Sequence, residues 1–208
     1  MKTIWSDLGN VPINVNVLAS IYSERKYVRN KISSLEDEGK IIRLKRGLYV
    51  ASPEFSDKLL SLNLIANHLY GPSYVSCQSA LAYYGLIPER VYGVTSMTMK
   101  HSRKFTNSLG TFDYIRCEQD VFAIGLDMQR ESDVSFVIAT PEKALCDLIA
   151  TTPGLNLRYT NEILTWLEDD IRFDMDEFFK LNVSILEEYA KVGKKSTMIT
   201  KLIKIIQR

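Results

Sequence analysis

The fold of the N-terminal part of the chain is decided by residues 27–50, which read YVRNKISSLEDEGKIIRLKRGLYV. The first half of this stretch predicts a helix, because Val28, Ile32 and Leu35 fall at i, i+4 and i+7 and therefore share one face. Gly39 follows the last turn, where a residue free to adopt positive φ ends a helix at little cost.

The second half, residues 41–50, predicts a short β-hairpin with a basic turn. Side chains of its first strand point alternately to two sides, one set being Ile41, Arg43 and Lys45 and the other Ile42 and Leu44. The chain then reverses at Arg46 and Gly47 and returns through residues 48–50.

A short helix, a tight turn, a basic helix and a hairpin are together typical of a winged helix-turn-helix. Residues 15–21 supply the first helix, and Ser23 is a candidate cap for the second. Between residues 24 and 47 there are eight basic and four acidic side chains, whereas the whole chain has a net charge of only +1. This local positive charge favours binding to double-stranded DNA, and the alternative is a module that binds another protein.

We expect the DNA contacts to come from the second helix, which enters the major groove in such domains, and from the hairpin. Arg29 and Asn30 are the candidates for base edges, because arginine pairs well with guanine and asparagine with adenine. Phosphate contacts are expected mainly from Ser23, Tyr27, Lys45 and Arg46. The remaining candidates on or next to the helix are Arg25, Lys26 and Lys31.

The predicted fold class is α+β, with a winged helix-turn-helix over residues 1–52 and a mixed second domain over residues 53–208. Pro53 marks the boundary, because proline cannot continue a paired central strand. A short leading helix is expected over residues 1–10, and further helices over residues 54–69 and 76–84. Strands at 91–99, 111–117, 121–127 and 134–139 predict a small, mainly antiparallel sheet.

A helical C-terminal region is expected to begin at Thr140, which can cap a helix whose first residue is Pro141. Further helices are expected near residues 160, 173–179, 184–192 and 196–207. Residues 155–190 carry nine acidic and three basic side chains, and residues 191–208 carry six basic and no acidic ones. These segments are either two solvated faces of opposite sign, or an acidic surface for a basic protein followed by a second phosphate contact.

The sequence excludes several other classes of protein. No run of about 18 apolar residues exists and the N-terminus lacks the apolar core of a secretion signal, so we expect a cytoplasmic protein with no membrane partner. Cys77, Cys117 and Cys146 match no zinc or redox spacing and are expected to be buried and free. No nucleotide-binding loop, hydrolase elbow or metal-ligand pattern is present, so we expect no cofactor, no metal and no enzyme activity.

Three groups of residues together resemble the AbiEi-type antitoxins of abortive-infection toxin–antitoxin operons. They are LKRGLY at 44–49; YVS at 74–76 with SAL at 79–81 and GL at 85–86; and EKAL at 142–145 with DL at 147–148. The resemblance implies a winged helix that represses its own operon by binding inverted repeats. It also implies a C-terminal domain that counters a toxin resembling a nucleotidyltransferase, without a stable complex between the two proteins.

Two other functions stay open at this point. A ligand-sensing regulator with the same DNA-binding unit would place a pocket near Tyr83, Tyr84, Tyr92 and Phe112. A nuclease would need a carboxylate pair, for which Asp113 with Glu118, or Asp147 with a distant partner, are the candidates.

Overall fold

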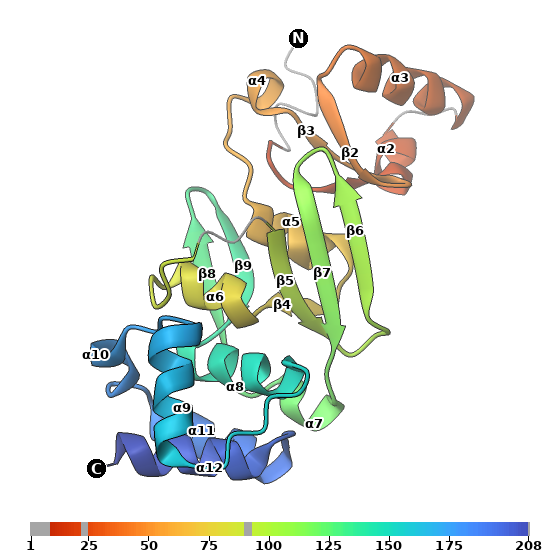
Figure 1. Cartoon of the computed structure of the whole chain (residues 1–208). Helices are drawn as coiled ribbons and strands as arrows, with labels where there is room; N and C mark the ends of the chain where they lie inside the picture. The colour runs from red at the N-terminus through yellow and green to blue at the C-terminus, as the bar shows by residue number, and fades with distance from the viewer. Residues whose placement is uncertain (1–8, 22–24, 90–92, 208) are drawn as a thin grey trace.

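The computed structural model describes residues 9–21, 25–89 and 93–207 (Figure 1). It confirms the α+β class: a three-stranded sheet near the N-terminus is followed by a six-stranded sheet and a group of C-terminal helices. We call residues 9–51 the N-terminal unit and residues 52–207 the C-terminal unit. Ser23 and most of the leading helix predicted over residues 1–10 lie outside the described residues.

The N-terminal unit contains the predicted pair of helices and the hairpin, in that order, preceded by a short strand that was not predicted. Its elements are β1 (Ile13–Asn14), α2 (Val15–Ile21), α3 (Arg25–Asp37), β2 (Ile41–Lys45) and β3 (Leu48–Ala51). The expected seam of α3 is confirmed, because Val28, Ile32 and Leu35 are only 2%, 6% and 3% exposed. Gly39 ends the helix at φ +68°, a conformation that favours glycine. The three strands are antiparallel in the order β1-β3-β2.

The hairpin β2–β3 is covered on both sides, which explains why every residue of β3 is buried. Tyr49 and Ala51 pack toward α3, in a small cluster with its apolar seam. Leu44, Leu48 and Val50 belong instead to the large core of the C-terminal unit. The predicted alternation along β2 holds from Ile41 to Leu44 and decides which of these side chains face α3 and which face the other unit. It is wrong for Lys45, which follows a bulge and contacts the C-terminal unit. The domain boundary at residue 52 stays a prediction.

The single helix predicted over residues 54–69 is wrong, because the chain forms two helices there, α4 (Pro53–Ser56) and α5 (Leu62–Leu69). Asp57 ends α4 in a left-handed conformation with φ +56°. Ser61 then starts α5 by accepting a hydrogen bond from the Leu64 amide at 3.1 Å. Leu59, which the apolar spacing placed in a buried stripe, lies between the two helices and is 78% exposed.

The large sheet has the strand order β6-β7-β5-β4-β9-β8. Its strands are β4 (Ser73–Val75), β5 (Gly93–Thr98), β6 (Arg103–Asn107), β7 (Gly110–Arg116), β8 (Leu126–Glu131) and β9 (Val134–Ala139). The β5/β7 and β4/β9 pairs are parallel and the other three pairs antiparallel. The strand expected over residues 121–127 is wrong: α7 (Gln119–Phe122) occupies its first half, and β8 begins after a turn at Gly125. Sequence reasoning missed β4 and β6.

Helices cover both faces of this sheet (Figure 1). On one face lies α5, where the Tyr114 hydroxyl of β7 donates to the Ala66 carbonyl at 2.6 Å. On the other face lie α6 (Cys77–Tyr83) and α8 (Pro141–Thr151), and the Tyr74 hydroxyl of β4 donates to Asp147 there at 3.0 Å. The predicted start of α8 is confirmed, because the Thr140 hydroxyl accepts from the Lys143 amide at 3.4 Å.

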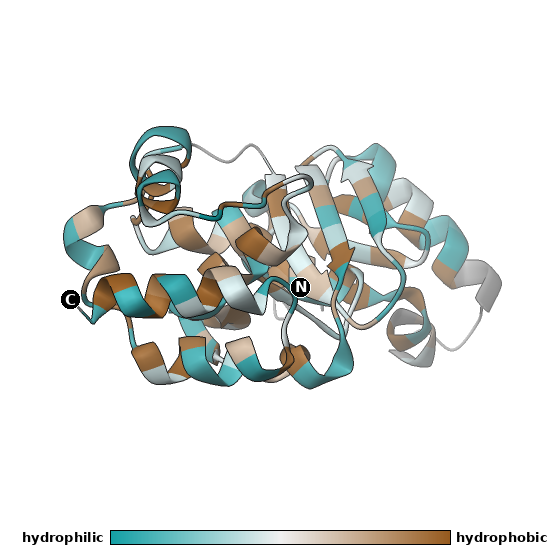
Figure 2. Ribbon diagram, turned by 60° about the horizontal axis from the view of Figure 1, so that its bottom comes forward, coloured by the Kyte–Doolittle hydropathy of each residue, from teal (hydrophilic) through white to brown (hydrophobic). Residues whose placement is uncertain are grey.

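The C-terminal helices build outward from α8. They are α9 (Thr160–Thr165), which continues into the π-helical turn η1 (Trp166–Asp170), then α10 (Met175–Phe178), α11 (Val183–Val192) and α12 (Ser196–Ile206). Helix α11 packs on α8 and α12 packs on α11. Figure 2 shows hydrophobic and hydrophilic residues alternating along these amphipathic helices. In the described ranges, no helix combines the length and the apolar character that crossing a bilayer requires.

Candidate nucleic-acid interface

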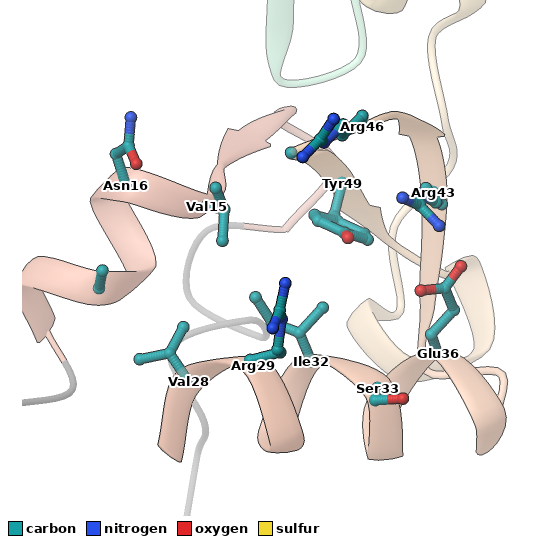
Figure 3. A pocket seen from close by; sticks show the side chains of 12 residues that line it. Val15, Asn16, Val28, Arg29, Ile32, Ser33, Glu36, Arg43, Arg46 and Tyr49 are labelled. Atoms are coloured by element: carbon teal, nitrogen blue, oxygen red, sulfur yellow. The ribbon is translucent and has the colours of Figure 1, made fainter. Parts of the chain in front are cut away.

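A groove of about 910 Å³ lies in the N-terminal unit between α2, α3 and the hairpin (Figure 3). Its apolar floor comes from the core of the unit, including Val28, Ile32 and Tyr49. Its polar wall consists of Asn16, Arg29, Ser33, Glu36, Arg43 and Arg46.

Three arginines from three elements meet at this groove. Arg29 comes from α3, Arg43 from β2 and Arg46 from the turn of the hairpin, and all three are exposed to solvent. Figure 3 shows Arg29 pointing from α3 toward the hairpin, where Arg46 lies. Glu36 contributes a carboxylate to the wall, opposite Arg43. Within the described residues, no ion pair shorter than 4.0 Å joins Glu36 to any of these arginines.

The sequence explains this convergence. Arg29, Ser33 and Glu36 follow the spacing of the buried seam displaced by one residue, so they form a second stripe about 100° around the helix. That stripe borders the groove, while the seam forms its floor. Arg43 alternates with Ile42 and Leu44 along β2 and therefore faces α3. Gly47 closes the hairpin at φ +79° and holds Arg46 at its tip.

Of the two residues predicted to contact bases, one lines the groove and the other does not. Arg29 lines it, whereas Asn30 is exposed on the next position around α3 and is absent from its lining. Lys31 is partly buried on the other flank of the helix. The side chains of Arg25, Lys26 and Tyr27 lie outside the described part of the structure, as does all of Ser23.

Lys45, expected to contact phosphate, is occupied within the molecule. Its ammonium donates to the Leu69 carbonyl at 2.5 Å and lies 5.8 Å from the centre of the Phe105 ring. A cation is favourable there because Leu69 is the last residue of α5, where carbonyl groups are left unpaired. Burial, followed by the charges of Lys100 and Arg103, lowers the pKa of Lys45. Lys45 therefore joins the two units, and a bulge after Arg43 directs it away from the groove.

Sequence reasoning missed Arg43 and Ser33 as site residues. The signal was present in both cases, because the alternation of β2 set Arg43 on the side of Ile41 and helical spacing set Ser33 beside Arg29. What the sequence alone did not reveal was that these two stripes face each other across one groove.

The basic C-terminal segment also makes internal contacts. The Lys195 ammonium donates to the carbonyls of Ile149 and Thr152 at 2.9 and 2.6 Å. Lys194 pairs with Glu118 at 3.4 Å. These contacts hold Lys194 and Lys195 against the rest of the C-terminal unit. A second phosphate contact would rest on the other residues.

Of the residues named for a ligand pocket in the C-terminal unit, Tyr83 is the one found to line this unit's cavity near it within the described residues. Tyr83 lines a cavity of about 500 Å³ together with Ala82, Glu89 and Glu131. Tyr84 does not line it, Phe112 is buried in the core at 1% exposure, and Tyr92 lies outside the described residues.

The carboxylates considered for a nuclease are engaged separately. Asp113 pairs with Lys104 at 3.6 Å and Glu118 pairs with Lys194. Asp147 is fully buried and pairs with Lys143 at 2.9 Å. In the part of the chain that the structure describes, no three histidine, cysteine or carboxylate side chains gather as a metal site would require. The three cysteines are buried and unpaired with one another, as predicted.

In comparisons with known proteins, no family model matches the chain, and no curated protein matches it significantly.

Proposed function

We propose that the chain is a DNA-binding transcriptional repressor whose N-terminal unit acts as a winged helix-turn-helix. In this proposal α2 and α3 are the helix pair, and β2–β3 is the wing. The order of elements and the antiparallel β1-β3-β2 sheet support it.

The groove lined by Arg29, Arg43 and Arg46 is the observation that carries the proposal. Three positive charges face one carboxylate there, so an incoming polyanion gains more attraction than it meets repulsion. Arginine suits this role because its planar guanidinium can donate two parallel hydrogen bonds to a phosphate or to a guanine edge. The outward position of Asn30 on α3 leaves it free to contact a base beside the groove.

Fluorescence anisotropy with labelled duplexes tests DNA binding. The wild-type chain should bind the DNA upstream of its own reading frame at least about a thousandfold more tightly than an unrelated duplex, as specific regulators do. Replacing both Arg29 and Arg46 by alanine should abolish this preference. Arg130→Ala is the matched control, because Arg130 is also exposed but lies on β8, outside the groove. Equal affinity for both duplexes would contradict the proposal and favour a protein-binding module.

We also propose an antitoxin role, which rests on the resemblance of the sequence to AbiEi-type antitoxins. The toxin would resemble a nucleotidyltransferase. Co-expression of this chain with such a protein encoded next to it should restore growth that the toxin alone arrests. The double arginine variant should still restore growth if repression and neutralisation are separate activities. Continued growth arrest with the wild-type chain would leave only the repressor function.

A further inference from the structure

A smaller cavity, of about 170 Å³, opens in the C-terminal unit where the parallel strands β5 and β7 end. The carboxyl ends of parallel strands are a common place for ligands in α/β proteins. The cavity is separate from the groove of the N-terminal unit and from the cavity at Tyr83. Its lining consists of Met97, Ile115, Arg116, Cys117, Glu118, Val121, Ala150, Thr151, Tyr189 and Lys194.

The lining divides into an apolar floor and a charged rim. Met97, Val121 and Tyr189 in the floor are 2%, 4% and 2% exposed. By contrast, the rim residues Arg116, Glu118 and Lys194 are all exposed. A molecule that fits both parts has an apolar body and one charged end.

Size limits the body of such a molecule to about one ring. Typical small-molecule sites have volumes of roughly 300–1,000 Å³, so this cavity is too small for a nucleotide or a peptide side chain with its backbone. An apolar cavity of about 150 Å³ in another protein accepts benzene. The present cavity, of about 170 Å³, therefore matches a single aromatic ring or a short branched aliphatic chain.

The floor is held rigid by a buried polar network. The Tyr189 hydroxyl donates to Asp147 at 3.3 Å, and the Lys143 ammonium lies 4.5 Å from the centre of the Tyr189 ring. Lys143 also donates to the Val121 carbonyl at 2.8 Å, which fixes a second residue of the floor. Because the Tyr189 hydroxyl is already used, the floor offers a fixed apolar surface, and a rigid surface loses little entropy on binding.

The rim favours a negative end on the ligand. Lys194 pairs with Glu118 at 3.4 Å, but both side chains are more than half exposed, so this pair is weak and easily exchanged. Among the described residues, Arg116 has no carboxylate partner. The rim therefore has one positive charge in excess of its single carboxylate.

We propose that this cavity binds small aromatic or branched aliphatic monocarboxylates of the size of benzoate. The ring or chain fills the floor beside Tyr189, and the carboxylate accepts hydrogen bonds from Arg116 and Lys194. The proposal goes beyond the DNA-binding function and does not depend on it.

Isothermal titration calorimetry of the full chain with benzoate tests the proposal. Benzoate should bind with one-to-one stoichiometry, whereas benzylamine, which has the same ring and the opposite charge, should not. Ala150→Leu fills the cavity and should abolish binding. Ala82→Leu is the matched control, because it adds the same volume to the separate cavity at Tyr83. Arg116→Gln should weaken binding roughly two- to fivefold, as expected for an exposed ion pair, and Lys191→Gln should leave it unchanged.

Thiol labelling with mapping of the modified peptide gives a readout at the site itself. Cys117 lines the cavity, whereas Cys77 and Cys146 do not. Benzoate should slow the modification of Cys117 selectively. No binding at millimolar benzoate, binding that survives Ala150→Leu, or tighter binding of benzylamine would each overturn the proposal, whatever the outcome of the DNA-binding experiments.

Discussion

Replacing Lys143 by methionine should destabilise the fold more than substitutions of exposed charged residues. Lys143 and Asp147 are both fully buried, one turn apart on α8, with 2.9 Å between nitrogen and oxygen. Removing one partner of a buried pair costs about 3–5 kcal/mol, because the other charge is left without compensation. For a chain of this size each kcal/mol shifts Tm by about 2–4 °C, so Tm should fall by roughly 6–20 °C.

Urea unfolding followed by circular dichroism measures this loss. Lys180→Met is the matched control: it breaks an ion pair of 2.7 Å with Glu177, but both side chains are exposed. The control should therefore lose much less stability than Lys143→Met, because both of its charges stay solvated. Replacing Asp147 by asparagine in the Lys143→Met background should recover part of the stability, because it removes the uncompensated charge and keeps an oxygen that accepts from the Tyr74 and Ser76 hydroxyls.

The stability lost in Lys143→Met should also depend on pH, and the protonation of the Asp147 carboxyl decides whether it grows or shrinks as pH rises. Burial raises the pKa of Asp147 above its usual 3.8, so the folded state holds this proton more tightly than the unfolded state. The stability contributed by the protonated form is complete below the unfolded pKa and is lost as pH rises through the folded one. Removing the Lys143 ammonium raises the Asp147 pKa further. The deficit of Lys143→Met should therefore be smaller at pH 5 than at pH 8. A deficit below about 1 kcal/mol at pH 8, or a larger one at pH 5, would refute the reasoning.

Three further substitutions test single features. Glu36→Gln removes the carboxylate of the groove and should tighten DNA binding roughly two- to fivefold in anisotropy titrations, whereas unchanged or weaker binding would place DNA elsewhere. Gly39→Ala should cost about 1–2 kcal/mol in urea unfolding, because φ is +68° although no atom lies within 4 Å of the added carbon. Thr140→Ala should cost about 1 kcal/mol by removing the cap of α8, and a neutral effect would discount that cap.

The sequence predicted α3 and the hairpin well because both have a single regular period. The seam at Val28, Ile32 and Leu35 and the alternation along residues 41–44 each fix a buried face, and the structure buries those faces. For the face of the hairpin that points away from α3, the sequence predicted which side chains lie on it but not what covers it. This face packs on the core of the C-terminal unit, which no local pattern specifies.

Errors occurred where local backbone geometry or distant pairing overrode the period. Asp57 in a left-handed conformation divides residues 54–69, although the apolar spacing continues across it. The apolar residues near Val121 form α7 and a turn. They were predicted as a strand because a short run of apolar residues does not distinguish a strand from a helix. The edge strand β6 was missed because it pairs on one side only, with β7, and all of its side chains are partly or fully exposed.

The candidate site was predicted only in part, because some of its residues come together through contacts between elements that are distant in the sequence. Arg29 and Arg46 were found from charge and position alone. Arg43 was overlooked because its proximity to Arg29 depends on how the hairpin folds against α3, a contact between elements. The internal contacts of Lys45 were not predicted, because its partners, Leu69 and Phe105, are distant in the sequence.

The salt dependence of DNA binding tests the central claim most directly. Each arginine that contacts phosphate displaces counterions from the DNA. Its removal should therefore make the negative slope of log K against log salt shallower by about one unit. Measured between low and physiological salt, Arg43→Ala and Arg46→Ala should each show this decrease, and together a decrease of about two. Arg130→Ala should keep the wild-type slope. Wild-type slopes for both groove variants, or no measurable DNA binding by the wild-type chain, would contradict the account.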